Sequence, residues 1–161
     1  MAVRGSCLCG AFSFELQKFS GPFEICHCNR CRKKSGSNGI AMIGANAEDY
    51  EVISGAGVVS SYEAPILNQP PPYHSYFCSK CGSTLPPPDP SGWFEIPAGL
   101  LDEDPGIRPD KHIYVELAAP WDLPSDYLPR YTVRDLARQR HNVELPPNQE
   151  IRTHHGKSIR V

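Results

Sequence analysis

The chain has 161 residues, and its 18 acidic and 16 basic side chains give a formal net charge of −2 at pH 7, which is too small to imply an acidic or basic partner. Its length suits one domain with a sizeable core, and 17 prolines with 13 glycines favour short strands and turns over a helical bundle. No apolar run reaches the roughly 18 residues of a membrane span, and the opening MAVRGSCLCG lacks the apolar segment of a signal peptide. We therefore expect a cytoplasmic protein with reduced thiols.

Alternation of apolar and polar residues predicts a series of short strands. They fall at residues 11–16, 50–54, 58–62, 73–78, 92–96 and 112–117. The glycine-containing stretch 55–57 is predicted as a hairpin turn between the second and third of these strands. Together these elements predict a mainly β, antiparallel fold with few short helices.

A helix is predicted near the end of the chain. Thr132 and Asp135 fit a capping box at the start of residues 133–141, and a polar tail follows Pro147. Residues 130–161 hold seven basic and three acidic side chains, whereas residues 1–129 hold nine and fifteen. We predict a β domain over residues 1–131, followed over 132–161 by a basic helix and a loose tail.

Seven cysteines, all before residue 82, are the strongest chemical signal. They form the groups Cys7 and Cys9; Cys26, Cys28 and Cys31; and Cys78 and Cys81. An odd count without an export signal argues against a disulfide framework, and these spacings in a reducing compartment favour zinc. We therefore predict that metal ions bound by these cysteines hold the edges of the strands together.

Four of the cysteines suit one closed site. A C-x-C pair on a strand presents both sulfurs to the same side. A C-x-x-C-G turn brings two sulfurs onto one ion, with Gly82 free to adopt a left-handed conformation. A tetrahedral site of Cys7, Cys9, Cys78 and Cys81 would tie the first strand to a turn some seventy residues later.

Cys26, Cys28 and Cys31 remain, and three protein ligands with one open position are typical of catalytic zinc. The alternative is that His27 or a distant side chain closes a second structural site. On an extended backbone His27 would point away from the flanking cysteines. Spacing alone does not decide how the cysteines pair.

Basic residues surround this triad. Arg30, Arg32, Lys33 and Lys34 could offset the charge of three thiolates on Zn²⁺ and attract an anionic substrate, or they could form a solvated loop. Sulfur ligands reduce the Lewis acidity of zinc, so the site suits a soft ligand such as a substrate thiolate better than water activation.

Three further residues are candidates for acid–base chemistry. His112 could act as an acid or base near the zinc, but we favour an edge-strand histidine paired with Asp110 or solvent. Asp102 and Asp104 predict a rigid turn in preference to a general base.

Five segments together resemble a known family. They are Gly5–Leu16, Cys26–Gly36, Phe77–Leu85, Pro97–Pro105 and Pro109–Trp121. In their order and approximate spacing they are similar to the glutathione-dependent formaldehyde-activating enzyme (GFA) family, which also contains the centromere protein V group. The resemblance covers about residues 3–130.

The resemblance implies two zinc ions per chain. By position, the structural zinc ligands are Cys7, Cys9, Cys78 and Cys81, and the second, catalytic zinc has Cys26, Cys28 and Cys31. It also implies an antiparallel β fold similar to that of small zinc-binding chaperones of Rab GTPases. Arg32 or Lys33 would meet a glutathione carboxylate.

The activity that the resemblance implies is a carbon–sulfur lyase reaction, the reversible condensation of formaldehyde with glutathione. We therefore predict a zinc-dependent lyase acting on adducts of an aldehyde with glutathione or a similar thiol. The alternative is a non-enzymatic zinc-binding module that recognises a protein partner. Nucleic-acid binding is disfavoured, because no aromatic platform accompanies the helix-face pair Arg134 and Arg138. No membrane partner is expected, and a homo-oligomer is compatible with the sequence.

Overall fold

The computed structural model describes residues 2–64, 73–122, 124–146, 150–152 and 158–160. The chain divides into two compact units, which we describe separately. Unit 1 comprises Met1–Phe23, Ala41–Tyr62 and His74–Pro109, and unit 2 comprises Glu24–Ile40, Glu63–Tyr73 and Asp110–Val161. In the described part of the chain, no helix is long and apolar enough to cross a membrane.

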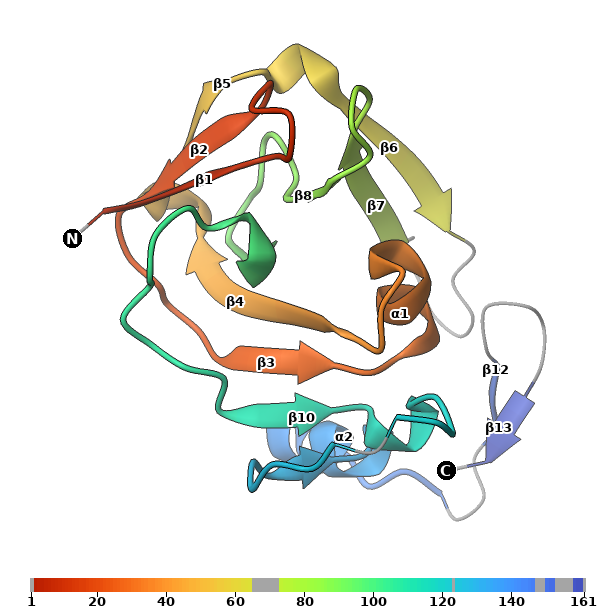
Figure 1. The fold of residues 1–161 in the computed structure, drawn as a ribbon. Helices are drawn as coiled ribbons and strands as arrows, with labels where there is room; N and C mark the ends of the chain where they lie inside the picture. Colours follow the sequence, from red (N-terminus) through yellow and green to blue (C-terminus); the bar gives the residue numbers. More distant parts are fainter. Residues whose placement is uncertain (1, 65–72, 123, 147–149, 153–157, 161) are drawn as a thin grey trace. The chain divides into compact units, whose positions relative to one another are not determined.

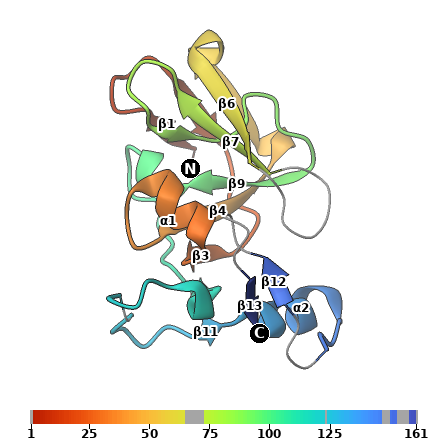
Figure 2. The ribbon, with the colours of Figure 1, turned by 90° about the vertical axis from the view of Figure 1, so that its right-hand side faces the viewer.

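Unit 1 is built from short strands (Figure 1). One sheet has the order β1 (Val3–Ser6), β2 (Ser13–Leu16) and β5 (Tyr50–Ser54), and both of its pairings are antiparallel. The strands β4 (Ile40–Asn46) and β9 (Trp93–Pro97) also pair antiparallel. A third sheet has the order β6 (Val59–Ala64), β7 (Tyr73–Cys78) and β8 (Thr84–Leu85), and Figure 2 shows β6 beside β7.

The core of unit 1 follows from the alternation in β2. Phe14 and Leu16 point to one face of the strand with Phe12 before them, and all three are fully buried. The Tyr50 ring lies 5.4 Å from Phe14 and 5.1 Å from Phe94, measured between ring centroids. Each fully buried aromatic side chain contributes about 1.5–3 kcal/mol of hydrophobic stabilisation. Cys7 and Cys78 belong to the same buried cluster.

The predicted hairpin at residues 55–57 is wrong. Gly55 has a φ of 81°, the short 3₁₀ helix η2 (Ala56–Val58) follows, and β5 and β6 belong to different sheets. The stretch therefore carries the chain from one sheet to the next. A glycine is needed there, because a Cβ on residue 55 would lie 1.9 Å from the carbonyl oxygen of Ala11.

Unit 2 has a parallel arrangement at its centre. β10 (Lys111–Ile113) lies between β3 (Phe23–Cys26) and β11 (Arg130–Tyr131) and pairs with both in parallel. Figure 1 shows β10 beside β3. The helix α1 (Asn29–Ser35) follows β3 closely, and α2 (Val133–His141) follows β11. β12 (Glu150–Arg152) pairs antiparallel with β13 (Ser158–Arg160). The prediction of a mainly β fold with few short helices is confirmed.

The strand predicted over residues 112–117 is half as long as expected. It ends at Ile113, because Tyr114 has a φ of 57°, and Val115–Leu117 forms the 3₁₀ helix η4. A left-handed residue turns an extended chain aside, and for a tyrosine this conformation costs about 1–3 kcal/mol. Tyr114 packs against the hydrophobic cluster of Cys26, Cys28, Ile113 and Leu136.

The helix predicted over residues 133–141 is confirmed, with its capping box. The Thr132 N–H donates to Asp135 Oδ2 over 2.8 Å, and the Asp135 N–H donates to Thr132 Oγ1 over 3.2 Å. The buried Leu136 packs among Cys26, Cys28 and Ile113. Arg140 donates from Nη2 to both carboxylate oxygens of the buried Glu24, at 2.5 and 2.6 Å. These contacts anchor α2 on β3.

Candidate metal centres

The four-cysteine cluster, Cys7, Cys9, Cys78 and Cys81, lies within unit 1. Two similar turns form it: the Gly10 N–H donates to the Cys7 carbonyl and the Gly82 N–H to the Cys78 carbonyl, each over 2.8 Å. Gly10 and Gly82 both adopt left-handed conformations, with φ of 70° and 76°. The left-handed conformation predicted for Gly82 is thus present.

The spacing of these sulfurs fits a tetrahedral metal ion. Four sulfurs at about 2.3 Å from a zinc ion lie about 3.8 Å apart. The Sγ atoms of Cys7 and Cys9 are 3.6 Å apart, those of Cys9 and Cys78 are 3.9 Å apart, and all four lie within 4.8 Å of one another. Hydrogen bonds from Ser83, from its side chain and then its backbone, lower the pKa of Cys81 to about 5. The cluster can therefore hold one divalent ion.

The cysteine triad, Cys26, Cys28 and Cys31, lies within unit 2. Cys26 ends β3, Cys28 is the N-cap of α1 and Cys31 lies in the first turn of that helix. The three Sγ atoms lie within 4.8 Å of one another, with Cys26 and Cys28 buried and Cys31 half-buried. A strand end followed at once by a helix is thus enough to gather three sulfurs from six residues.

The acid–base chemistry of the triad also favours a cation. Hydrogen bonds from Cys26 and Cys31 lower the pKa of Cys28 to about 2, whereas Cys28 and Cys31 raise the pKa of Cys26 well above its ordinary value. One thiolate is therefore favoured and further ionisation is opposed. A divalent ion allows all three thiols to lose their protons, so the donor set fits a metal.

His27 does not join the three sulfurs. Its Nε2 lies 2.8 Å from Nδ1 of His112, and its Nδ1 lies 3.5 Å from Oδ2 of Asp122. Among the residues whose placement is described, the group of potential metal ligands here contains the three cysteines alone. The alternative in which His27 closes the site is not supported.

The position predicted for His112 is wrong. It lies on β10, which is paired on both sides and is therefore not an edge strand, it is buried, and its carboxylate partner is Asp126 in place of Asp110. His112 Nε2 is 3.0 Å from both carboxylate oxygens of Asp126. Burial removes the ring from solvent, and the carboxylate compensates for the water it loses.

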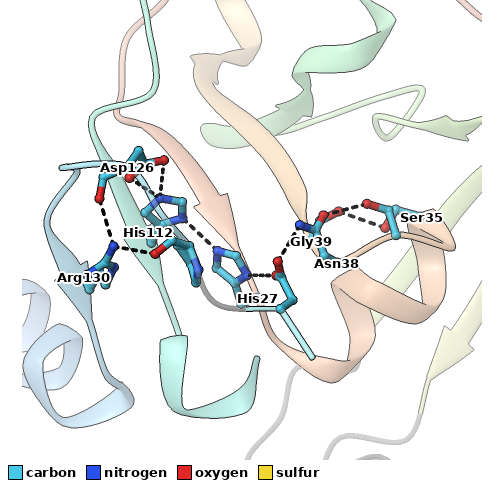
Figure 3. Close-up of polar contacts among 10 residues, drawn as sticks. His27, Ser35, Asn38, Gly39, His112, Asp126 and Arg130 are labelled. Atoms are coloured by element: carbon cyan, nitrogen blue, oxygen red, sulfur yellow. Dashed lines mark hydrogen bonds and ion pairs between the residues drawn. The ribbon is translucent and has the colours of Figure 1, made fainter. Parts of the chain in front are cut away.

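The result is a chain of side chains that runs from Asp126 through His112 to His27 (Figure 3). It continues from His27 to Asp122. Since Asp126 accepts from Nε2–H of His112, Nδ1 of His112 accepts from Nε2–H of His27. Burial, and after it His112, lower the pKa of His27, which favours the neutral ring. Its Nδ1 is then an acceptor, and this atom and Asp122 Oδ2 are both buried without a hydrogen-bond partner among the described residues.

Sequence reasoning missed this chain of contacts. The two histidines are 85 positions apart, and their link depends on the parallel pairing of β3 with β10. The acidic residues of the segment 122–126 were the available signal, but their spacing to either histidine carries no information on contact.

The basic residues near the triad lie on α1. Arg32 is half-buried and donates to Asn29 Oδ1 over 2.8 Å, and Lys33 is exposed. Arg30 contributes to the lowered pKa of Cys28. Arg32 and Lys33 therefore share a short helix with Cys31, as their spacing requires.

Asp102 and Asp104 form the predicted turn. Asp102 accepts from Ser6 Oγ over 2.8 Å, and Asp104 accepts from the Gly106 N–H over 2.8 Å and from both terminal nitrogens of Arg108. Neither aspartate joins a cysteine cluster in the part of the structure described.

Comparisons with known proteins bear on the family. A crystal structure of a Rhodobacter sphaeroides protein covers 80% of this chain and 99% of its own at 19% identity with a TM-score of 0.48, which is too weak to support an argument. A protein of Halomonas elongata named "Putative glutathione-dependent formaldehyde-activating enzyme" is 35% identical over 126 residues, which are 75% of this chain and 80% of the relative. The family model for the glutathione-dependent formaldehyde-activating enzyme matches residues 2–117. The chain therefore belongs to the GFA family.

Proposed function

We propose that the protein is a zinc-dependent carbon–sulfur lyase that acts on adducts of an aldehyde with glutathione or a similar thiol. The single observation that carries the proposal is the triad, which offers three sulfur ligands and, within the described residues, no fourth. Three protein ligands leave a coordination position for an exchangeable group. Membership of the GFA family supports a thiol as that group.

The reaction needs no oxidant or reductant. In the forward direction a bond forms between the thiol sulfur and the aldehyde carbon, and the proton of the thiol reaches the aldehyde oxygen. In the reverse direction the carbon–sulfur bond breaks, the sulfur keeps the electron pair and the hydroxyl proton leaves. The catalyst has to favour the ionised sulfur and hold it beside the aldehyde carbon.

The residues of unit 2 divide these tasks. Cys26, Cys28 and Cys31 would hold Zn²⁺, and a bound Zn²⁺ would favour the thiolate form of the substrate. Cys31 is the most exposed of the three, so the substrate would approach from its side. Arg32 and Lys33 on the same helix would attract the carboxylates of glutathione.

The four-cysteine cluster has a different task in this proposal. Cys7 and Cys78 are buried in the core of unit 1, and four sulfurs fill a tetrahedral coordination shell. A zinc ion held by Cys7, Cys9, Cys78 and Cys81 would therefore stabilise the fold and take no part in the reaction.

The test is the rate at which glutathione exchanges with its hydroxymethyl adduct, measured by NMR exchange spectroscopy because formaldehyde and thiols also react without an enzyme. We expect the wild type, with two zinc ions per chain, to raise the exchange rate above that background. Cys31→Ser should lose one zinc ion and fall to the background rate, while its circular dichroism spectrum stays that of the wild type.

The matched control is Ser37→Ala, which changes an exposed residue just after the same helix. It should keep both zinc ions and the wild-type rate. A wild type with two zinc ions and no rate above background, tested with several thiols and aldehydes, would overturn the lyase and favour the zinc-binding module that recognises a partner.

A further inference from the structure

His27 occupies a position from which it can control the triad. It is the one residue between Cys26 and Cys28, so its backbone torsions decide where one sulfur lies relative to the other. Its N–H donates to the Ile113 carbonyl over 3.0 Å, which ties the main chain of the triad to β10. The strand pairing sets Cys26 opposite Ile113, next to His112.

The His27 ring is held as firmly as its backbone. Nε2 is hydrogen-bonded to His112 at 2.8 Å, and the two rings are tilted by 41° with centroids 5.0 Å apart. Both residues are buried, with 2% and 3% of their surface exposed. A buried N–H that loses its acceptor costs about 1–3 kcal/mol, so rotation of the His27 ring away from His112 is opposed.

The other side of the His27 ring is enclosed as well. A Cβ added to Gly39 would lie 2.8 Å from the Cys26 carbonyl oxygen and 3.6 Å from His27 Nδ1, so the main chain at Gly39 packs closely there. Asp122 Oδ2 faces Nδ1, and the other oxygen of Asp122 accepts from Asn38 Nδ2 over 3.0 Å. Figure 3 shows His27 between His112 on one side and the Asn38–Gly39 segment on the other.

His112 is itself anchored to a loop of unit 2. Asp126 binds its Nε2, and the Leu128 N–H donates to Asp126 Oδ1 over 3.0 Å. Arg130 Nη2 donates to the main-chain carbonyls of Pro124 and Asp126, at 2.6 and 2.9 Å. The position of the His112 ring is therefore set at both nitrogens.

We propose that His112 is a positioning residue for the cysteine triad: held by Asp126, it fixes the His27 ring and thereby the separation of the Cys26 and Cys28 sulfurs that the metal requires. The proposal rests on the metal site of the proposed function, though it does not need the lyase reaction. Outer contacts that orient metal ligands typically contribute 10–100-fold to metal affinity.

The four-cysteine cluster supplies an internal reference. Its outer contacts include one from the Phe12 N–H to Cys7 Sγ, at 3.3 Å, and one between Ser83 Oγ and Cys81 Sγ, also at 3.3 Å. In the part of unit 1 that is described, no histidine–histidine contact accompanies it. A change at His112 should therefore weaken one metal site and spare the other.

Two substitutions separate the two contacts of His112. In His112→Asn the amide oxygen reaches the place of Nδ1, so it can accept from His27 while the contact with Asp126 is lost. In His112→Gln the longer amide reaches the place of Nε2 and Asp126, and His27 loses its acceptor. The matched control is His141→Gln, at an exposed histidine that ends α2.

The experiment measures zinc affinity at each site by competition with a chromophoric chelator, and the thiolate-to-metal absorption of the Co²⁺-substituted protein. His112→Gln should weaken the triad site about 10–100-fold and change its Co²⁺ spectrum, with the other site unchanged. His112→Asn should keep affinity and spectrum near those of the wild type, and His141→Gln should match the wild type at both sites.

Three outcomes overturn the proposal. Equal affinities of the triad site in wild type, Asn and Gln variants would show that His112 does not position the sulfurs. Equal weakening of both metal sites would show a general loss of stability. Weakening of the triad site in the Asn variant, with wild-type affinity in the Gln variant, would show that the contact with Asp126, and not the link to His27, is what matters. A wild type that binds one metal ion in total contradicts the proposed function itself, whereas an inactive protein with these affinity changes contradicts the lyase alone.

Discussion

The two cysteine clusters assemble in opposite ways. The four-cysteine cluster joins two turns about seventy residues apart, and two of its members lie in the main core of unit 1. The triad comes from six consecutive residues at a strand–helix junction. A long-range cluster can exist only when the chain is folded, whereas a local cluster needs only its own segment. We therefore expect metal binding to be tied to folding in unit 1 and to ligand exchange in unit 2.

Disruption of the four-cysteine cluster should destabilise the protein more than any other change considered below. Cys78→Ser removes a buried sulfur from it, and we expect unit 1 to lose its cooperative unfolding transition at 25 °C, because structural zinc contributes folding free energy directly. Circular dichroism during urea titration measures the transition. Lys80→Ala, in the same turn, is the control and should unfold as the wild type does. A Cys78→Ser protein with wild-type stability would remove the distinction between the clusters.

The rate of metal removal should differ between the two clusters. With a chelator in excess, we expect one zinc ion to leave the wild type at least about tenfold faster than the other, because an open coordination position lets the chelator attack directly. Cys31→Ser should lack the fast phase. Stopped-flow absorbance of the zinc–chelator complex measures both phases. A single phase that releases two zinc ions would mean that the clusters do not differ in access.

A smaller effect on the free energy of unfolding is expected at two carboxylates that bind α2 in unit 2. Glu24 is 2% exposed and Glu144 is 66% exposed, although each lies 2.5 Å from an arginine of that helix. Glu24→Gln should lower the free energy of unfolding by about 1–3 kcal/mol, since it leaves Arg140 and Lys111 beside a neutral group. Glu144→Gln should change it by less than about 0.5 kcal/mol, because exposed pairs contribute little.

Hydrogen exchange shows where the Glu24 substitution acts. Protection should fall in β3, β10 and α2, and the strands β1, β2 and β5 should exchange as in the wild type. Equal losses from Glu24→Gln and Glu144→Gln would mean that burial does not distinguish the two pairs.

The sequence predicted the parts of the fold that depend on local pattern. The strands at residues 50–54 and 73–78 and the helix at 133–141 have the predicted bounds, since alternation and a capping box report directly on local structure. The sequence spacing suggested a set of four cysteines and a set of three without deciding between the possible pairings, and the structure brings these same two sets together.

The features that the sequence did not predict share a physical cause. Each depends on the sign of a backbone φ or on pairing between distant segments. Alternation continues through Tyr114, but its left-handed backbone ends β10. The glycines of residues 55–57 predict a turn, but packing decides which sheet receives the strand that follows it. The His27–His112 contact depends on β3 and β10 being parallel neighbours, which neither segment encodes by itself.

The anchoring of α2 has a consequence for how the chain can be cut. The family model ends at residue 117, yet later residues complete the surroundings of the triad. Asp126 binds His112, and Arg140 binds Glu24. Tyr131 and Leu136 pack in the hydrophobic cluster that contains Cys26 and Cys28. A fragment trimmed to the family boundary would leave the carboxylate of Glu24 without Arg140 and the Nε2 of His112 without its acceptor. The shortest independently stable piece of this protein that carries the triad is therefore expected to extend through the last turn of α2.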